Sequence, residues 1–424
     1  MSAIRAVLFG AGDRGTTAYA PYALEYPDEL KFVAVAEHRQ SRRENFARLH
    51  GIPPNQCYER GEDFWAQPKI ADAAVICTSD KEHYLPAKTA LENGYHVLLE
   101  KPLSTNAARC IALKEIAEKN HVTLMTCYVL RYTPFYQRLY ELIEQGKIGR
   151  LLSIQEHENV GFAHFSHSYV RGNWHNTERS CSMILSKSCH DLDIFYWFAG
   201  SPCKSVQSFG NLNYFTQANA PRGATERCTD GCPAREACVY YAPVLYGREN
   251  SGFASSIVAD GADPSARMEA LKTGPYGKCV FRNDNDACDN QVVNILFENG
   301  ITVSFIINGL TYECNRNIRL YGTEGEVRGD LLRNTIDVYS FRGGATEHIE
   351  LHGYQDRHGG GDHGIIHDFV EVLRGGGKKL TTVQNSLESH IIAFAAEESR
   401  RTGRVVEMKE YAAQLKNTGD LNCE

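Results

Sequence analysis

The feature that most constrains the fold is a glycine-rich turn directly after a short apolar stretch near the N-terminus. Residues 4–9, Ile-Arg-Ala-Val-Leu-Phe, have the composition of a buried strand, and a segment with the spacing G-x-G-x-x-G follows at once. In dinucleotide-binding βαβ units these glycines permit a tight turn, close approach of pyrophosphate and close helix packing. Pyrophosphate would bind backbone N–H groups at the helix N-terminus. We therefore predict a cofactor phosphate loop made of Gly10, Gly12, Asp13, Arg14 and Gly15.

An acidic residue follows the next strand-like stretch. Residues 31–36 are mostly apolar and end in Glu37, which lies 22 positions after Gly15. An acid at this place binds the ribose hydroxyls of NAD and disfavours the 2′-phosphate of NADP. Glu37 therefore favours NAD, while His38 and Arg39, which come next, leave some use of NADP open.

Strand-like and helical stretches alternate through the first third of the chain. Residues 71–77, 96–99 and 122–127 resemble strands, and residues 86–93 and 106–120 resemble helices. Strands separated by helices indicate parallel βαβ units. The sequence predicts an α/β fold class, with a Rossmann domain over residues 1–128 and a second domain over residues 129–424.

Residues 97–102, Val-Leu-Leu-Glu-Lys-Pro, place a charged pair where one predicted strand ends. Ligands of parallel sheets bind outside the carboxyl ends of the strands, which is where Lys101 would emerge. Lysines at such positions are often solvated or ion-paired. From the residues alone, Lys101 is either a catalytic group or the partner of Glu100.

Composition and charge disfavour several classes of protein. The 424 residues suffice for two domains, and 45 basic against 52 acidic residues give a net charge of −7. This balance indicates neither nucleic acid nor an anionic membrane as a partner. No apolar stretch is long enough to cross a bilayer, and residues 1–10 lack a signal-peptide pattern, so we expect a cytoplasmic protein.

Several motifs together resemble the glucose–fructose oxidoreductase/inositol dehydrogenase (Gfo/Idh/MocA) family. They are the glycine loop, Glu37, Thr78 with His83, Glu100-Lys101-Pro102, and residues 128–134, Tyr-Val-Leu-Arg-Tyr-Thr-Pro. The resemblance implies a C-terminal α+β domain with an open, largely antiparallel sheet, whose two faces cover the cofactor and form a homodimer or homotetramer. It also implies that Thr78, His83 and Glu100 lie at the cofactor, and that Lys101 contacts both the cofactor and the substrate hydroxyl.

The second domain contains a candidate general base. Residues 186–193, Ser-Lys-Ser-Cys-His-Asp-Leu-Asp, stand where the family has Asp-x-Gly-x-His-x-x-Asp, so His190 and Asp193 match while Ser186 and Ser188 depart from it. The resemblance makes His190 the base for the hydroxyl proton, a role that suits a pKa near neutrality. The alternative is a buried helix histidine behind the site. The missing acid leaves the orientation of His190 open.

The substrate side is predicted from polar and aromatic segments. Residues 171–176, Arg-Gly-Asn-Trp-His-Asn, suit stacking and hydrogen bonding to a sugar, although a surface loop explains them equally well. His363 and His367 are four apart, which permits metal binding, but ordinary surface histidines on a capped helix explain them better. Our candidate substrate ligands are Arg131, Trp174, His175, Lys187, Asp191 and His358.

A cysteine cluster lies in an insertion, about residues 219–279, that the family core does not need. Cys228, Cys232 and Cys238 form C-x3-C-x5-C in a Gly- and Pro-rich segment, and Cys279 stands at its far end. Close thiolates on a turn-rich loop favour a structural zinc ion with Cys279 as the fourth ligand. Free thiols are the main alternative. An iron–sulfur cluster is less favoured, because the spacing fits no standard cluster run.

These features predict an NAD-dependent oxidoreductase acting on a carbinol group of a small-molecule sugar, glycoside or polyol. Hydride would pass to nicotinamide while Lys101 and His190 handle the hydroxyl proton, and the lysine charge would stabilise the developing alkoxide. We expect burial to lower the pKa of Lys101 and ease proton exchange. One alternative is glycoside cleavage with tightly bound NAD, through transient oxidation, elimination and re-reduction. A non-catalytic NAD-bound sensor is another.

Overall fold

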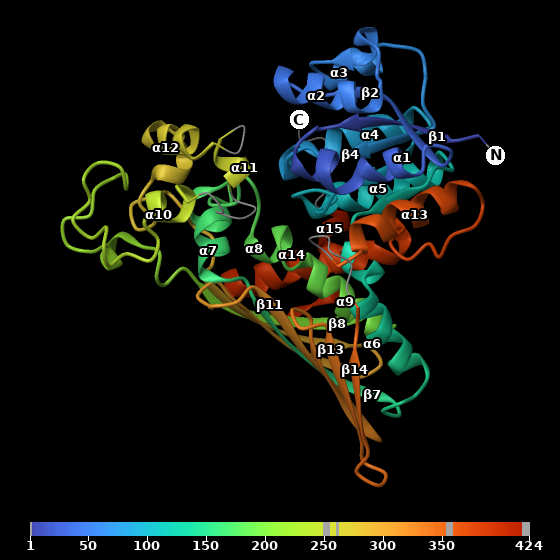
Figure 1. The fold of residues 1–424 in the computed structure, drawn as a ribbon. Helices are drawn as coiled ribbons and strands as arrows, with labels where there is room; N and C mark the ends of the chain where they lie inside the picture. Colours follow the sequence, from blue (N-terminus) through green and yellow to red (C-terminus); the bar gives the residue numbers. More distant parts are fainter. Residues whose placement is uncertain (1, 249–254, 260–262, 353–358, 418–424) are drawn as a thin grey trace.

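The structure is a computed structural model, and it describes residues 2–248, 255–259, 263–352 and 359–417. Two β-sheets organise the chain, one in each half of the molecule (Figure 1). The first is a parallel six-stranded sheet, and the second is a mostly antiparallel nine-stranded sheet. The predicted fold class is therefore confirmed.

The first sheet has the doubly wound strand order β3-β2-β1-β4-β5-β6, and every pair is parallel. In this order the ligand crevice lies at the switch point between β1 and β4. The strands are β1 (Ile4–Phe9), β2 (Leu30–Ala36), β3 (Cys57–Tyr58), β4 (Ala73–Ile76), β5 (His96–Leu99) and β6 (Leu124–Thr126). Every residue of β4 is buried, as expected for a central strand that helices cover on both faces.

Helices connect these strands and pack on both faces of the sheet. The Asn106 side chain accepts a hydrogen bond from Arg109 N and caps α5, while Gly51, at φ +65°, ends α2. The helices are η1 (Arg14–Tyr19, a π-helix), α1 (Pro21–Glu25), α2 (Gln40–His50), α3 (Gly61–Trp65), α4 (Tyr84–Glu92) and α5 (Ala107–Lys119). Short 3₁₀ turns elsewhere in the chain lie at Pro54–Gln56, Asp80–Glu82, Val129–Tyr132, Gln217–Asn219 and Pro275–Gly277.

The second sheet has the order β14-β13-β12-β11-β7-β10-β9-β8-β15, and its β7–β10 pair is parallel. Gly300, at φ +86°, closes the predicted hairpin between β9 and β10. The strands are β7 (Leu151–Asn159), β8 (Cys203–Asn211), β9 (Asn290–Phe297), β10 (Thr302–Asn308), β11 (Asn315–Gly322), β12 (Gly325–Asp330), β13 (Thr335–Ser340), β14 (Thr346–Glu350) and β15 (Val406–Glu407).

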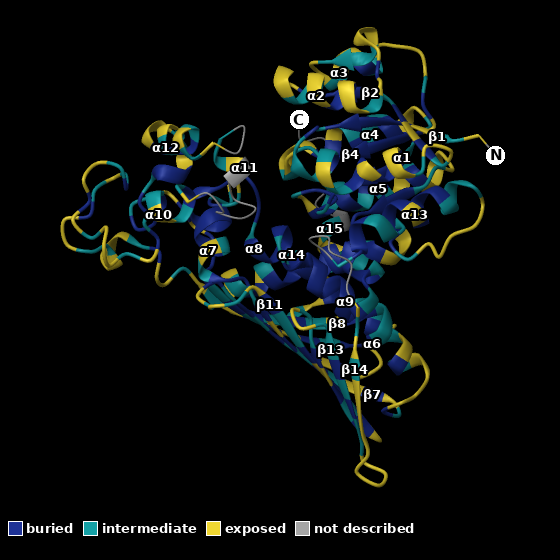
Figure 2. Cartoon of the chain, in the orientation of Figure 1, coloured by how far each residue is buried: buried dark blue, intermediate teal, exposed yellow. Residues whose placement is uncertain are grey.

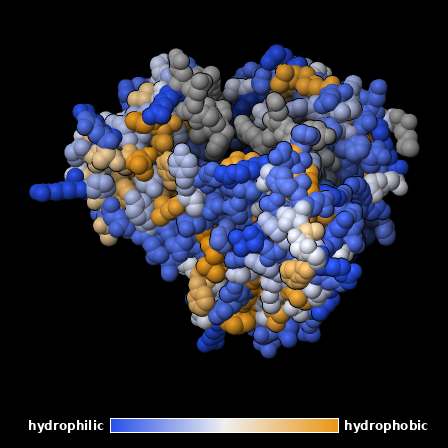
Figure 3. Space-filling view, turned by 60° about the horizontal axis from the view of Figure 1, so that its bottom comes forward, coloured by the Kyte–Doolittle hydropathy of each residue, from blue (hydrophilic) through white to orange (hydrophobic). Residues whose placement is uncertain are grey.

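Helices cover one face of this sheet and leave the other open (Figure 1). The residues between the sheet and these helices are buried (Figure 2). On the open side, apolar side chains form separate patches among polar ones (Figure 3). A shallow hollow of about 430 Å³ lies over β8, β9 and β10. The helices include α6 (Pro134–Glu144), α7 (Phe162–Phe165), η5 (Ser166–Arg171, a π-helix), α8 (Met183–Ser186), α9 (Cys189–Ala199), α14 (Val383–Thr402) and α15 (Met408–Asn417).

One late helix returns to the first half of the molecule. Ile365, Ile366 and Phe369 of α13 (Gly361–Leu373) belong to the apolar core beneath β1 and β2. Thr126 N also donates to Thr381 O at 2.9 Å, beside the last strand of the parallel sheet. The core of the Rossmann half therefore depends on residues far beyond position 128.

The insertion forms a lobe with its own small apolar core (Figure 1). It contains α10 (Ala242–Tyr246), α11 (Ser255–Val258) and α12 (Pro264–Thr273), so it is more helical than its Gly- and Pro-rich composition indicates. Among the described helices, none combines the length and apolar composition that a membrane crossing requires.

Candidate active site

The three glycines of the phosphate loop meet different steric demands. Gly10 has φ +86°, and a Cβ there would lie 2.6 Å from Cys77 O of the adjacent β4 segment. A Cβ at Gly15 would lie 2.4 Å from Gly10 O, so this glycine lets the helix pack closely on the strand. A Cβ at Gly12 would lie 3.6 Å from its nearest neighbour, Arg42 Nη1, so the space beside Gly12 is open. The loop fits a turn that a pyrophosphate group approaches closely.

Glu37 lies where β2 ends and faces the phosphate loop. Its carboxylate is buried, with Oε2 accepting from Ala11 N at 2.8 Å and Oε1 accepting from Arg39 N at 2.9 Å. His38 Nδ1 is 3.2 Å from Oε1. A carboxylate held beside the loop is in place for a ribose ligand, and these residues fit NAD.

Arg14 differs from its predicted role as a phosphate ligand. Its Nε donates to Glu100 Oε1 at 2.7 Å, and its Nη2 donates to Asp362 Oδ1 at 2.6 Å. The Tyr19 hydroxyl also donates to Glu100 Oε1. Burial alone would raise the pKa of Glu100, but Arg14 and Lys101 lower it, which keeps the carboxylate charged. The Arg14 side chain therefore braces the loop against β5 and α13.

His83 connects the ends of two neighbouring strands. Its Nδ1 lies 2.7 Å from Pro102 O, its Nε2 lies 3.0 Å from Thr78 O, and the ring is buried. Thr78 Oγ1 donates to Glu82 O at 3.1 Å. Both predicted cofactor residues thus hold the segment that carries Lys101, and their polar side-chain atoms bond to the protein itself.

Lys101 emerges at the carboxyl end of β5, as predicted. Its Nζ donates to Ser186 O at 2.8 Å, across from the segment that leads into α9. Burial alone would lower the pKa of Lys101, but Cys189, Glu100 and Asp80 raise it above its usual value. The lysine is therefore held as a cation, and the expected lowering of its pKa is wrong because neighbouring acidic groups outweigh burial.

His190 lies in the first turn of α9, in the same segment that Lys101 contacts. Its ring packs edge-on against Tyr128, with ring centroids 5.8 Å apart, and the residue is 9% exposed. The Tyr128 hydroxyl lies 2.9 Å from His390 Nδ1. Leu103 N donates to His390 Nε2 at 2.9 Å, so the hydrogen-bond network assigns the ring proton of neutral His390 to Nδ1. Two histidines thus flank one tyrosine beside the lysine loop.

Arg131 is placed away from a substrate role. Its Nε and Nη2 donate to the two carboxylate oxygens of Asp193 at 2.6 and 2.7 Å, and both side chains are buried. Its Nη1 donates to Leu380 O at 2.9 Å. These contacts engage the guanidinium within the protein, so the prediction that Arg131 binds substrate is corrected. The pair instead ties the turn after β6 to α9.

The predicted substrate ligands Lys187 and Asp191 belong to a buried ionic cluster. Glu158 Oε1 lies 3.4 Å from Lys187 Nζ and 2.7 Å from Arg316 Nη2. Arg316 Nε also donates to Asp191 Oδ1 at 2.5 Å. Burial opposes the charge on Glu158, but Arg316 and Lys187 lower its pKa to about 2. Asp191 is fully buried, whereas the Lys187 side chain is 17% exposed and forms the open edge of the cluster.

This cluster supplies carboxylates near the position where Ser186 replaces the family acid. Ser188, which replaces the glycine, donates from Oγ to Glu158 Oε2 at 2.7 Å. Glu156, also on β7, is fully buried, and burial together with Asp191 raises its pKa well above the usual value. The sequence analysis did not identify Glu156 and Glu158. Their spacing of two residues places both on one face of a strand and could have indicated a paired acidic site.

Trp174 and His175 lie on a loop that reaches the parallel sheet. Trp174 Nε1 donates to Asp80 Oδ2 at 2.8 Å, and Ser180 Oγ donates to the same oxygen at 3.1 Å. His175 Nδ1 lies 2.6 Å from Gly172 O, and its Nε2 lies 3.4 Å from Asp284 Oδ1. Asp80 was missed, although it follows β4 within Thr78-Ser79-Asp80 at the ligand edge of the sheet.

The remaining histidine predictions have separate outcomes. His358 lies outside the described residues. The rings of His363 and His367 pack on Tyr22, with centroids 4.9 and 6.4 Å away. Neither belongs to a metal site, since no group of three or more His, Cys, Asp or Glu side chains in the described part of the chain is arranged to hold a metal ion.

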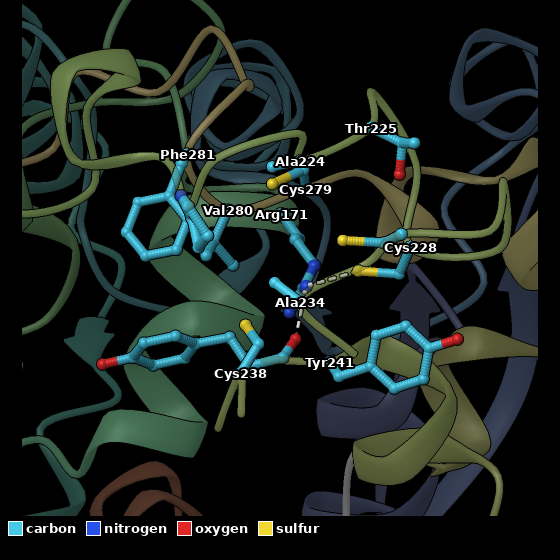
Figure 4. A pocket seen from close by; sticks show the side chains of 13 residues that line it. Arg171, Ala224, Thr225, Cys228, Ala234, Cys238, Tyr241, Cys279, Val280 and Phe281 are labelled. Carbon is cyan, nitrogen blue, oxygen red and sulfur yellow. Dashed lines mark hydrogen bonds between the residues drawn. The ribbon is translucent and has the colours of Figure 1, made fainter. Parts of the chain in front are cut away.

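The four predicted cysteine ligands do come together. Cys228, Cys232, Cys238 and Cys279 line one cavity with Arg171 (Figure 4). All are free thiols, and within the described ranges they do not form a group that could hold a metal ion. The juxtaposition of the cysteines is therefore as predicted, whereas the predicted tetrahedral zinc site is not formed.

Two family models match most of the chain. Residues 4–128 match the model described as oxidoreductase family, NAD-binding Rossmann fold, and residues 140–408 match the model described as oxidoreductase family, C-terminal alpha/beta domain. Oxidoreductase YteT of Bacillus subtilis is 24% identical over 342 residues, which is 77% of this chain and 78% of YteT. Inositol 2-dehydrogenase of Corynebacterium glutamicum is 31% identical over 190 residues, 44% of this chain and 48% of that enzyme.

Solved structures share the fold along nearly the whole chain. An oxidoreductase from Agrobacterium radiobacter, in complex with NAD+, L-tartaric acid and magnesium, aligns with a TM-score of 0.69 at 15% identity, covering 97% of this chain and 100% of that one. Aldose–aldose oxidoreductase from Caulobacter crescentus, complexed with glycerol, aligns with a TM-score of 0.65 at 16% identity, covering 96% and 99%. With both halves matched by its family models, the chain belongs to the Gfo/Idh/MocA family of NAD-binding oxidoreductases.

Proposed function

We propose that the protein oxidises a carbinol group of a sugar, glycoside or polyol with NAD as the hydride acceptor. The observation that carries the proposal is the place of Lys101, which stands at the ligand edge of the parallel sheet and bonds to the segment that bears His190. A cationic lysine and an imidazole beside one cofactor crevice suit the removal of a hydroxyl proton during hydride transfer.

Each residue has a definite part in this proposal. The glycine loop and Glu37 would hold NAD, which would supply the hydride acceptor. Lys101, whose neighbours raise its pKa, stabilises the negative charge that develops on the substrate oxygen. His190 takes the hydroxyl proton, and Tyr128 holds its ring edge-on. The buried Glu37 carboxylate beside Ala11 supports NAD over NADP, because it would face a 2′-phosphate with like charge.

The substrate class rests on polar groups and on the names of relatives. Trp174 offers an aromatic face next to Asp80, and Lys187 presents the open edge of the ionic cluster. One relative is an inositol 2-dehydrogenase, and one structural neighbour is an aldose–aldose oxidoreductase. A polyhydroxylated substrate is the class that these groups would bind best.

The test is a panel of free sugars, polyols and glycosides incubated with NAD. We expect NADH to form with at least one free sugar or polyol, and much more slowly when NADP replaces NAD. Product analysis runs in parallel, so that cleavage of a glycoside is detected as well. An absence of NADH formation across the panel, with NAD bound, would contradict the proposal.

A second candidate is glycoside cleavage with NAD retained. It needs a further base to remove the proton beside a transient keto group. Asp191, which follows His190 in α9, belongs with Glu158 to an ionic cluster that opens at Lys187, and these carboxylates favour this candidate. Release of the aglycone without net NADH would select it over the first.

We also propose that the chain assembles into a dimer or tetramer through the open face of the nine-stranded sheet. The apolar patches and the hollow over β8, β9 and β10 support this. Light scattering on the purified chain tests it, and a monomer at micromolar concentration would count against it.

A further inference from the structure

One segment of the second half is held at two points by side chains that follow neighbouring strands of the parallel sheet. Asp80 follows β4 and contacts the loop of residues 174–181, the Trp174 loop. Lys101 follows β5, and its Nζ donates to Ser186 O at 2.8 Å, in helix α8, which comes directly after this loop. Because β4 and β5 are paired, an acidic and a basic side chain at one edge of the sheet contact the same segment. His190 lies on the continuation of that segment.

The Asp80 carboxylate accepts hydrogen bonds from both ends of the Trp174 loop. Trp174 Nε1 donates to Asp80 Oδ2 at 2.8 Å, and Ser180 Oγ donates to the same oxygen at 3.1 Å. The neighbouring Lys81 Nζ donates to Glu178 O, within the loop. Hydrogen bonds to a charged acceptor are about twice as strong as those between neutral groups. The carboxylate therefore ties the loop firmly to the carboxyl end of β4.

The other side of the Trp174 loop contacts the segment that follows the insertion. Thr177 N donates to Asp286 Oδ1 at 2.8 Å, and Asn176 Nδ2 donates to Asp284 O at 3.0 Å. These two aspartates belong to the same half of the molecule as the loop itself. Asp80, by contrast, joins the loop to the half that carries the predicted cofactor crevice. Its hydrogen bonds therefore help to set how closely the loop approaches the carboxyl ends of β4 and β5.

Asp80 also affects the lysine that follows the next strand. Burial alone would lower the pKa of Lys101, but Cys189, Glu100 and Asp80 raise it. One carboxylate thus interacts with both the Trp174 indole and the Lys101 ammonium group. These are two of the groups that the proposed function assigns to the substrate side of the crevice.

We propose that Asp80 is a positioning residue for substrate oxidation, which holds the Trp174 loop beside Lys101 in the arrangement that binds a polyhydroxylated substrate. The inference rests on the proposed function, and it assigns Asp80 no contact with the reacting atoms. A loop that is already held in place does not have to be ordered when the substrate binds, which lowers the free-energy cost of binding. Loss of the carboxylate should therefore weaken substrate binding more than it slows hydride transfer.

The first measurement is the steady-state kinetics of Asp80→Asn with NAD and the best substrate of the panel. Asparagine has nearly the same shape but no charge, so its hydrogen bonds to the loop are weaker. We expect KM for the substrate to rise about tenfold, while kcat falls by no more than about threefold and the affinity for NAD stays the same. Asp63→Asn, at an exposed acid on α3, is the control and should change none of the three. An unchanged KM in Asp80→Asn overturns the proposal.

A second variant tests whether Asp80 acts through the loop. Trp174→Phe keeps an aromatic ring but removes the indole N–H that donates to Asp80. If the two residues act together, their effects are not additive, so Asp80→Asn should raise KM by at most about threefold in the Trp174→Phe background. A tenfold rise in both backgrounds would show that Asp80 acts independently of Trp174, contrary to the proposal.

Hydrogen exchange of the full chain separates this inference from the proposed function. Local opening of the Trp174 loop exposes its amides to exchange. Peptides that span residues 174–181 should exchange about tenfold faster in Asp80→Asn than in wild type or Asp63→Asn, whereas peptides from β4 should not change. Trp174→Phe should show the same increase, which keeps the test decisive if Asp80→Asn does not fold.

The two proposals fail in different ways. A wild-type chain that reduces no NAD with any substrate of the panel contradicts the proposed function, and exchange of the loop still reports whether Asp80 holds it. Loop exchange that is the same in wild type, Asp80→Asn and Trp174→Phe overturns the role of Asp80, whatever substrate the protein oxidises.

Discussion

At the scale of single residues, ionisable side chains of the site keep their charge because neighbouring ionisable groups stabilise it. Lys101 stays cationic because Cys189, Glu100 and Asp80 outweigh its burial, and Glu100 stays anionic because Arg14 and Lys101 outweigh its own. These groups are neighbours of the predicted cofactor site, so NAD binding and lysine charge share one electrostatic network. Changes at one member should alter the others.

Glu37 gives the sharpest prediction at this scale. Glu37→Gln removes the carboxylate charge while keeping an oxygen that accepts from Ala11 N. We expect NAD to bind roughly tenfold more weakly, since a hydrogen bond to a charged group contributes about 1.5–3 kcal/mol, and we expect discrimination against NADP to fall. Nucleotide binding measured by NADH and NADPH fluorescence checks this. Glu59→Gln, at an exposed acid, is the control, and equal effects of the two changes would argue against the ribose assignment.

Several residues of the site could be predicted from the sequence, but the tertiary ion pairs that these residues form could not. Gly10, Glu37 and Lys101 follow from strand ends and spacing, which are local properties. Arg131 and Lys187 looked like substrate ligands, because a sequence does not reveal that Asp193 and Glu158 neutralise them from other elements. Such pairing depends on how α9 and β7 meet, which is a property of the tertiary fold.

At the scale of elements, helix α9 both carries the proposed base and is anchored to the rest of the fold by buried ion pairs. Its first turn carries His190 and Asp191. Asp193, two residues further along, anchors the helix to Arg131. Ser389 of α14 also donates to Asp193 at 2.9 Å. The orientation of His190 is thus fixed by a buried ion pair behind it, and by the Arg316 contacts of Asp191.

Removing one member of the buried pair should be severe. Arg131→Met leaves the Asp193 carboxylate buried without its partner, and breaking a buried pair in this way costs about 3–5 kcal/mol in the free energy of unfolding. Urea unfolding followed by circular dichroism measures this. Arg138→Met, in a surface pair with Glu141, is the matched control, with an expected loss of at most about 1 kcal/mol. Similar losses for both variants would show that the Arg131 pair does not hold α9.

The elements themselves were largely predictable. Apolar runs marked the central strands, and Asn299-Gly300 marked the β9–β10 hairpin. The helices of the insertion were not anticipated, since Gly and Pro dominate its composition and α10 and α12 are stabilised by packing against each other. Their formation depends on contacts between segments about twenty residues apart, which local composition does not encode.

At the scale of the whole molecule, the two halves share their cores. α13 completes the packing beneath β1 and β2, and α14 contacts both the nine-stranded sheet and α5. His390 of α14 bonds to Leu103 N in the loop after Lys101. The sequence predicted two domains but not this interleaving, because the apolar face of a helix does not specify which sheet the helix will pack against.

The buried histidine on α14 gives the fold a defined pH response. Burial lowers the pKa of His390 to about 4, against about 6.5 in the unfolded chain. Between these values the unfolded chain binds more protons, so this contribution to stability is present above about pH 6.5 and is lost as the pH falls toward 4. His390→Gln should flatten the pH dependence of unfolding by about 1.4 kcal/mol per pH unit in that window. Urea unfolding at pH 7 and pH 5 measures it, and parallel profiles for the two chains would refute the assignment.

Lys101, as the residue that stabilises the developing alkoxide, is the central element of the proposed mechanism. The most direct measurement is the turnover number of Lys101→Met with NAD and the best substrate of the panel, alongside NAD affinity. Lys119→Met, at an exposed lysine on α5, is the control. We predict a loss of roughly 10²–10³ in kcat for Lys101→Met, with NAD still bound and the control unchanged. Turnover within a few-fold of wild type would contradict a catalytic role for Lys101.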